Sequence, residues 1–517
     1  MRRRVGSFLL STVLVACGAG STDVESPPAD DDGTAGTAGA AGKGGQSGGA
    51  GAAGKASTGG GGGAAGEAGA AGEAGAAGEA GMSGAAGAAG AAGQPTATFD
   101  QHDKDRSQCL FGTGDPTTKT IGPAVPHGDA LPFEHVVVLM LENRSFDHYF
   151  SKLPSYGVTD VDVAKDGDGN YDPTVSPPKF VSRYHEPRYC IKDTNHEWNG
   201  VHLQYDGGKM SGFLATNNPG GARALGYYDA TDLPFYYWMA KTFAISDRNF
   251  SSLLGPTWPN RFFFYGGSSW GNTKTGDLGD IVPFVGVVGK TLLQQMDEAK
   301  RTWKIYRDGL VSFAIVLKQD LKYYGSPMSD FAKDVAADKL PHLTILDPSF
   351  TGGAQNDEHP PANVQQGQAL VARTLTALWS NPKVWTKTVF FLMYDEHGGF
   401  YDHAPPPPAC EPDGMVPEDF RFDRLGVRTP LFAISPWTKA GYVSHQVTDH
   451  TSVTRFIQNR FDLPALTARD ANAWPLFDMF DFSKETFPTP PTGAPASPVA
   501  QAGVDWCKQN PPGTGLP

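Results

Sequence analysis

Two long apolar runs in the sequence each end abruptly in acidic and amide residues. Residues 135–141 and 389–394 are apolar at nearly every position, with no alternation of polar and apolar side chains. Such runs predict strands that are buried on both faces of a mainly parallel sheet. Ligands bind beyond the carboxyl ends of the strands in sheets of this kind. The side chains expected there are Glu142, Asn143, Asp395 and Glu396.

The rest of the globular part alternates between strand-like and helix-like patterns. Buried strands are predicted at 302–306, 343–346 and 429–435, helices at 233–242 and 364–379, and a helix or buried segment at 261–265. Asp449 is predicted to cap a further amphipathic helix that ends at Phe461. This alternation of strands and helices predicts a layered α/β fold.

The first residues have the features of an export signal. Residues 1–4 form a short basic region with three arginines, residues 5–13 form a short mainly apolar region, and residues 14–17 match the small-residue pattern of a bacterial lipoprotein signal. We expect residues 1–17 to be a lipoprotein signal peptide with Cys17 lipidated after cleavage, the alternative being an ordinary secretory signal. The chain has no other run of about 20 apolar residues. We therefore expect an exported lipoprotein in the outer membrane, the periplasm or at the cell surface, held to a membrane by its lipid alone.

Residues 18–98 are nearly all Gly, Ala, Ser, Thr and Glu. Glycine recurs at every third position over residues 66–93, as in collagen, but the imino acids that a triple helix needs are missing there. This composition cannot bury enough apolar surface to order the chain, so we expect a flexible, disordered linker. Residues 99–517 have a globular composition and are expected to form the functional domain.

Charge and cysteine content restrict the partners and the compartment. The chain has a formal net charge of −13, to which the signal contributes only positive residues. An acidic chain without a polybasic run is not expected to bind nucleic acid or anionic lipid surfaces by charge. Four cysteines remain besides Cys17, and two disulfides are expected in an exported chain. The residues are Cys109, Cys190, Cys410 and Cys507, for which three pairings exist.

The residue types at the two strand ends predict a metal site. Carboxylate and amide oxygens converging from two strands suit a hard divalent cation. Residues 254–261 add a hydroxyl, Thr257, in a turn made rigid by two prolines. A metal, a hydroxyl and histidines together favour chemistry on phosphoric esters.

Several motifs in this order resemble one known family. The motifs are Glu142–His148, Gly255–Arg261, Asp357–Pro361, Asp395–His403 and Asp449–Ser452. The chain is similar over residues 133–461 to the phosphoesterase family, which includes bacterial and plant non-specific phospholipases C and a group of bacterial acid phosphatases. The resemblance implies an alkaline-phosphatase-like layered sandwich, with a central mainly parallel sheet flanked by helices, and a phosphoesterase catalytic domain over residues 99–517.

The resemblance also implies roles for individual residues. The metal and nucleophile region is carried onto Glu142, Asn143, Thr257, Asp395 and Glu396, with Thr257 at the nucleophile position. His196 and His359 correspond to histidines around the phosphate, and His342 is a weak candidate for a third. Positions expected to orient the others are Asp147, His397 and Asp402.

The expected activity is a phospholipase C reaction that uses a divalent metal and a phosphothreonine intermediate. A periplasmic acid phosphatase acting on phosphomonoesters is the alternative, because the chain lacks the extra carboxyl-terminal domains of larger bacterial phospholipases C. A third hypothesis is a non-catalytic binding protein on a hydrolase scaffold. The residues leave the metal, the headgroup and the oligomeric state open.

Overall fold

A computed structural model describes residues 102–276, 289–310, 312–318, 320–350, 355–412, 421–497 and 499–510. Its centre is an eight-stranded sheet with the order β12-β6-β11-β10-β1-β9-β7-β8. The strands are β1 (His135–Leu141), β6 (Ala244–Ser246), β7 (Trp303–Arg307), β8 (Ser326–Pro327), β9 (Leu343–Asp347), β10 (Thr388–Tyr394), β11 (Leu431–Ile434) and β12 (Val443–Ser444). Only β11 among them runs against the others, since it pairs antiparallel with both β10 and β6.

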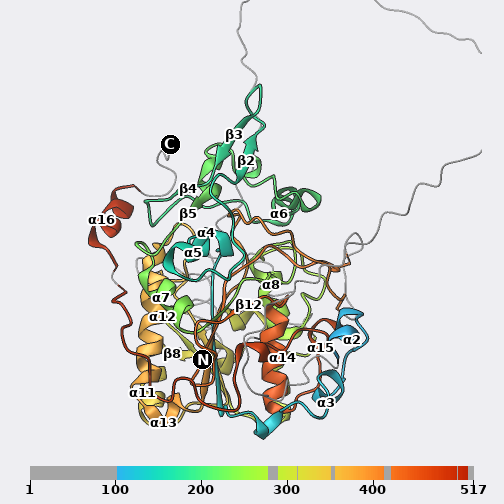
Figure 1. Cartoon of the computed structure of the whole chain (residues 1–517). Helices are drawn as coiled ribbons and strands as arrows, with labels where there is room; N and C mark the ends of the chain where they lie inside the picture. The colour runs from blue at the N-terminus through green and yellow to red at the C-terminus, as the bar shows by residue number, and fades with distance from the viewer. Residues whose placement is uncertain are drawn as a thin grey trace, which may run out of the picture. The chain divides into compact units, whose positions relative to one another are not determined.

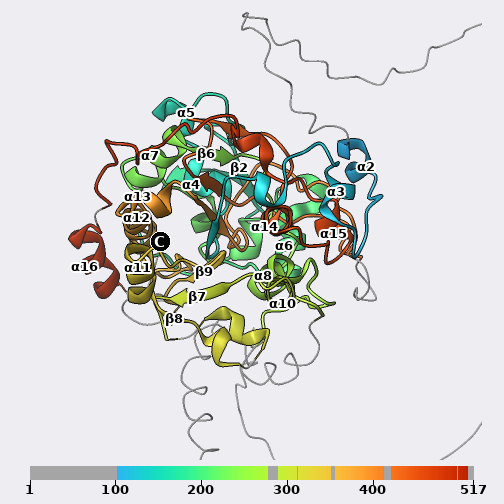
Figure 2. The same cartoon turned by 90° about the horizontal axis from the view of Figure 1, so that it is seen from below.

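Helices cover both faces of this sheet because alternate residues of each central strand point to opposite sides. Val136, Val138 and Met140 of β1 pack into one apolar core, and the intervening residues pack into the other. The first core receives α8 (Thr257–Gly266), α10 (Leu292–Glu298) and α14 (His450–Phe461). The second receives α4 (Phe146–Phe150), α7 (Pro234–Thr242), α11 (Met328–Ala336), α12 (Val364–Trp379) and α13 (Pro382–Trp385). The two groups lie on opposite sides of the strands in Figures 1 and 2. The predicted layered α/β fold with a mainly parallel sheet is confirmed.

The chain leaves the sheet after α4 and forms small elements beside the carboxyl end of β1. They are α5 (Leu153–Tyr156), the antiparallel pair β2 (Gly169–Asp172) and β3 (Lys179–Ser182), the parallel pair β4 (Tyr184–His185) and β5 (Gly226–Tyr227), and α6 (Trp198–Tyr205). Figure 1 shows them grouped on one side of the large sheet, next to α4. The remaining helices are α2 (Asp103–Ser107), α3 (Thr117–Thr120), α15 (Ala468–Ala471) and α16 (Gln501–Gln509).

Most predicted elements agree with the structure to within two residues at each end. The helix at 364–379 has the predicted bounds, and the Asp449 side chain accepts a hydrogen bond from the Thr451 amide at the start of α14. One prediction was wrong: Thr257 does not lie in a turn but is the first residue of α8. Pro259 is compatible with this helix because the first turn needs no amide hydrogen from it.

Two disulfides join distant parts of the chain, as the cysteine count predicts. Cys109 pairs with Cys410, and Cys190 pairs with Cys507, at sequence separations of 301 and 317 residues. Of the helices in the described ranges, none has the length and apolar character needed to cross a membrane. Cys17, the signal peptide and the linker predicted at 18–98 lie outside the described residues.

Candidate active site

The two acidic turns lie side by side, as the sequence predicts. β1 and β10 are adjacent and parallel, and Leu141 is in register with Tyr394, so the following residues leave the sheet together. The Asn143 backbone amide donates to Asp395 Oδ1 over 3.0 Å. Asn143 has a φ of 64°, a left-handed conformation that non-glycine residues adopt rarely. The contact with Asp395 holds it there and directs its side chain into the site.

Arg261 joins the two turns from the neighbouring helix. This fully buried residue of α8 donates from Nη2 to Glu142 Oε1 over 2.9 Å, and its Nε lies 3.4 Å from Asp395 Oδ2. Thr257 precedes Arg261 by four residues, so both lie on the same face of α8. The Thr257 side chain is 8% exposed. The structure thus brings the hydroxyl to the side of the helix that faces the two acidic turns.

The buried acids of the site carry more negative charge than the nearby cations balance. Burial raises the pKa of Glu142, Asp357 and Glu396, and repulsion from a neighbouring carboxylate raises each further. Burial opposes the charged form of His196, but Glu396 and then Asp193 outweigh it and raise the pKa of that imidazole to about 9. The site therefore favours additional positive charge.

Two ligand-type oxygens in the site have no hydrogen-bond partner. Within the described ranges, Asn143 Oδ1 and Glu396 Oε1 are buried without one. An unsatisfied buried acceptor is costly, and a cation can satisfy it. Oxygen donors with excess negative charge fit a divalent cation, as predicted.

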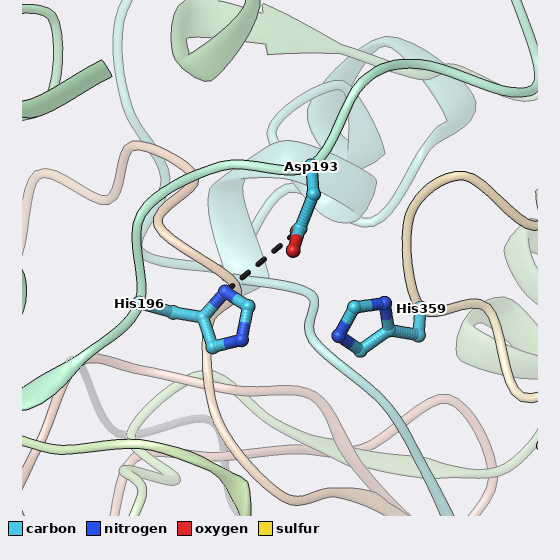
Figure 3. A group of neighbouring side chains, drawn as sticks. All are labelled: Asp193, His196 and His359. Atoms are coloured by element: carbon cyan, nitrogen blue, oxygen red, sulfur yellow. Dashed lines mark ion pairs between the residues drawn. The ribbon is translucent and has the colours of Figure 1, made fainter. Parts of the chain in front are cut away.

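A second group of possible metal ligands lies next to the acidic turns. Ligand atoms of Asp193, His196 and His359 all lie within 4.8 Å of one another. Figure 3 shows the Asp193 carboxylate directed between the two imidazole rings, whose centroids are 5.4 Å apart. His196 Nε2 is 3.2 Å from Asn143 Nδ2, so this group is continuous with the first. Both histidines therefore lie near the acidic turns, and their predicted role around the phosphate stays a prediction.

Sequence reasoning missed several residues of the site. They are Asp193, Arg261, Asp357 and His450. Arg261 and Asp357 stand inside motifs that the sequence analysis used, but nothing in the pattern distinguishes a buried cation or acid from an exposed one. His450 Nε2 is 2.8 Å from the carbonyl oxygen of Tyr394, the residue before Asp395. Asp193 could have been found from the sequence, because it stands three residues before His196 and two ligand-type side chains at such a short spacing can lie close together.

Asp147 and Asp402 belong to a separate buried cluster. Arg428 donates from Nε to Asp402 Oδ1 over 2.8 Å, and its Nη2 lies 3.2 Å from Asp147 Oδ1. His403 Nδ1 lies 2.6 Å from Asp147 Oδ2. These contacts connect the segments that follow β1 and β10 to the segment that precedes β11. No side-chain contact links Asp147 or Asp402 directly to Glu142 or Asp395 in the described ranges. Their expected role in orienting the site stays a prediction.

His397 differs from these two acids because it contacts the site directly. Its Nδ1 lies 3.3 Å from Glu396 Oε2, and its Nε2 lies 2.7 Å from Gln204 Oε1. Burial, with a smaller repulsion from His196, lowers the pKa of His397 to about 3. The neutral imidazole donates from Nε2 to Gln204, so its Nδ1 carries no proton and makes no hydrogen bond to Glu396. The predicted orienting role of His397 stays a prediction.

The suggestion that His342 is a phosphate-site histidine was wrong. His342 directly precedes β9, so it lies at the amino end of the strand, whereas the acidic turns follow the carboxyl ends of β1 and β10. Its Nδ1 contacts the Thr302 hydroxyl over 2.8 Å. Strand direction therefore places it at the opposite edge of the sheet.

Comparison with known proteins agrees with this geometry. Residues 133–464 match the model of the Phosphoesterase family. Phospholipase C B of Mycobacterium tuberculosis is 31% identical over 437 residues, covering 72% of this chain and 82% of that protein. Non-hemolytic phospholipase C of Pseudomonas aeruginosa is 30% identical over 442 residues, covering 75% and 63%. Non-specific phospholipase C6 of Arabidopsis thaliana is 33% identical over 375 residues, covering 66% and 70%.

Solved structures similar to this chain are more distant. The lipoteichoic acid synthase LtaP from Listeria monocytogenes has a TM-score of 0.37 at 8% identity, covering 72% of this chain and 81% of that one. A protein in the alkaline phosphatase superfamily from Vibrio parahaemolyticus has a TM-score of 0.31 at 10% identity, covering 59% and 74%. The family match and the relatives above 30% identity identify the chain as a member of the phosphoesterase family and a phosphoric ester hydrolase.

Proposed function

We propose that the protein is a phospholipase C that cleaves phospholipids into diacylglycerol and a phosphorylated headgroup. The observation that carries this proposal is the similarity over most of the chain to several proteins named phospholipase C. The site supports it, because a hydroxyl, buried acids and histidines converge beyond the sheet. An acid phosphatase built on the same centre is the competing function.

A divalent ion would be held by Glu142, Asn143, Thr257, Asp395 and Glu396. The partnerless oxygens of Asn143 and Glu396 and the raised pKa of Glu142 and Glu396 support this assignment. When bound, such an ion favours the alkoxide form of a hydroxyl and neutralises charge on a phosphate oxygen. Arg261 would keep Glu142 and Asp395 at a fixed separation for it.

Thr257 would act as the nucleophile. Its Oγ1, deprotonated before the attack, forms a bond to phosphorus in line with the departing diacylglycerol oxygen, which gives a phosphothreonine and breaks the phosphorus–oxygen bond of the lipid. Asn143 Nδ2 and the cationic His196 donate to phosphate oxygens, whose charge grows in the transition state. Water then attacks the phosphothreonine, releases the phosphorylated headgroup and returns the Thr257 oxygen in its deprotonated form, while the proton of the water goes to His359.

His359 would provide the proton that the leaving oxygen needs. Its Nδ1 lies 2.5 Å from the carbonyl oxygen of Pro360 and donates to it, so Nε2 remains for proton transfer. After the lipid alcohol departs, the neutral imidazole accepts a proton from the attacking water. His196 is a poorer candidate because its raised pKa keeps it charged.

We also propose that Cys17 anchors the mature protein through a lipid and that residues 18–98 tether the domain. The two disulfides of the domain fit an exported protein, because such bonds persist in oxidising compartments. A flexible tether would let the site reach phospholipids in a nearby membrane.

The decisive experiment compares two substrates with the purified, metal-loaded protein. We expect diacylglycerol to be released from phosphatidylcholine vesicles with a kcat/KM at least about tenfold above that for phenyl phosphate, a gap of about 1.4 kcal/mol in transition-state stabilisation. Preference for the phenyl phosphate monoester by the same factor would establish the acid phosphatase instead. A Thr257→Val variant controls for contaminating hydrolases in both assays.

A further inference from the structure

Glu358 is a buried acid that the proposed mechanism does not use. It lies between Asp357 and His359, and its side chain has no exposed surface. Three tyrosine hydroxyls donate to its carboxylate: Tyr149 and Tyr394 to Oε2 over 2.7 and 2.8 Å, and Tyr236 to Oε1 over 2.6 Å. The carboxylate therefore binds to α4, β10 and α7 at once.

The backbone of Glu358 is also held in place. Its φ is 74°, in the left-handed region that a glutamate rarely adopts. The Arg144 guanidinium donates from Nε to the Glu358 carbonyl oxygen over 2.9 Å. A Cβ added at Gly367 of α12 would lie 2.2 Å from Glu358 Cγ, so only glycine leaves room there for this side chain.

Two of these partners, Tyr394 and Arg144, are directly bonded in sequence to residues of the active site. Tyr394 directly precedes Asp395, and Arg144 directly follows Asn143. The Asp357 carbonyl oxygen accepts a hydrogen bond from the Glu142 amide over 2.8 Å. Glu358 is thus bonded to the segments that carry both acidic turns, and it is covalently next to His359.

We propose that Glu358 is a positioning residue that fixes His359 relative to the two acidic turns. Burying a carboxylate costs free energy, and an apolar side chain of similar size is often at least as stable. A carboxylate that accepts three hydroxyl hydrogen bonds instead fixes one arrangement of α4, β10 and the 357–359 loop. This inference rests on the proposed role of His359 as the proton donor.

The test is a double-mutant cycle between Glu358→Gln and His359→Ala on two substrates. One substrate has an alkyl leaving group, which needs a proton, and the other is its nitrophenyl analogue, which hardly does. We expect Glu358→Gln to lower kcat on the alkyl phosphodiester about 10- to 100-fold, as loss of a residue that orients a ligand group typically does. The loss on the nitrophenyl diester should be several-fold smaller. Glu358→Gln should cause no further loss in the His359→Ala background.

A matched pair of tyrosine variants on α7 separates positioning from stability. Tyr236→Phe removes one hydroxyl that donates to Glu358, whereas Tyr237→Phe removes a buried hydroxyl that donates to backbone carbonyl oxygens. Only Tyr236→Phe should change the ratio of kcat on the alkyl diester to kcat on the nitrophenyl diester, even if both variants lower Tm. If Glu358→Gln does not fold, this pair of variants still tests whether Glu358 positions His359.

Two results would overturn the inference. The first is a double variant whose loss of kcat equals the product of the two single losses, which would mean that Glu358 and His359 act independently. The second is an equal loss on both substrates in Glu358→Gln or in Tyr236→Phe. If the wild-type enzyme proves to be a phosphatase, alkyl and nitrophenyl phosphomonoesters replace the diesters, and the outcome for Glu358 is read in the same way.

Discussion

Replacing His403 with glutamine should destabilise the protein at neutral pH but much less in alkali. The His403 ring lies between two carboxylates, with Nδ1 2.6 Å from Asp147 Oδ2 and Nε2 3.0 Å from Asp162 Oδ1. Burial disfavours the charged ring, but the hydrogen bonds to Asp147 and Asp162 outweigh this effect and raise the pKa of His403 to about 10. Glutamine keeps a similar volume but carries no charge.

The size of this stabilisation follows from the pKa of His403 in the unfolded and in the folded chain. The interval between an unfolded pKa of 6.5 and a folded value of about 10 corresponds to about 5 kcal/mol of preference for the charged ring. Because the folded pKa is the higher one, this stabilisation is fully present below pH 6.5. It declines as the unfolded chain loses its proton, and it is lost as pH rises through about 10.

The assay is thermal unfolding of the wild type and of His403→Gln at pH 6 and at pH 9.5. We expect the variant to have a Tm about 5 to 10 °C lower at pH 6 and a difference of only a few degrees at pH 9.5. A difference that stays constant between the two pH values would refute the reasoning. It would show that His403 contributes by packing rather than by charge.

Three further predictions concern the mechanism and the anchor. Thr257→Val should fold normally and lose several orders of magnitude in kcat, whereas Thr257→Ser should keep substantial turnover; Val turnover above about a tenth of wild type would remove Thr257 as the nucleophile. Glu142→Gln and Asp395→Asn should each lose bound divalent metal by elemental analysis, and full metal content in both would assign these acids another role. Cys17→Ser should move the protein out of the membrane fraction, and unchanged fractionation would argue against a lipid anchor.

The sequence predicts both the central strands and the acids beside them, because an apolar run that ends at an acidic residue marks the strand and its carboxyl end together. A strand buried on both faces must be apolar along its length, so its end is visible where Glu142 or Asp395 begins. Helix α12 is predicted with its correct bounds for a similar reason, since its buried positions recur with helical spacing. In the structure Asn363 caps it.

Other features depend on contacts between segments that are distant in the sequence. The prolines around Thr257 are typical of a turn, and only the packing of α8 against the sheet shows that a helix begins there. Asp193 joins His359 across more than 160 residues, a proximity that no local spacing encodes. The direction of β11 is likewise set by pairing with β10 and β6, not by its own apolar residues.

The two disulfides impose an order of events on the making of this enzyme. In an unfolded chain that is exported amino end first, Cys109 and Cys190 cross the membrane about 300 residues before their partners. By the time Cys410 has emerged, the segments bearing Glu142, Thr257 and Asp395 are all outside the cytoplasm. Neither covalent closure can therefore precede translocation of Glu142, Thr257 and Asp395. A chain exported in this way matures only beyond the cytoplasmic membrane.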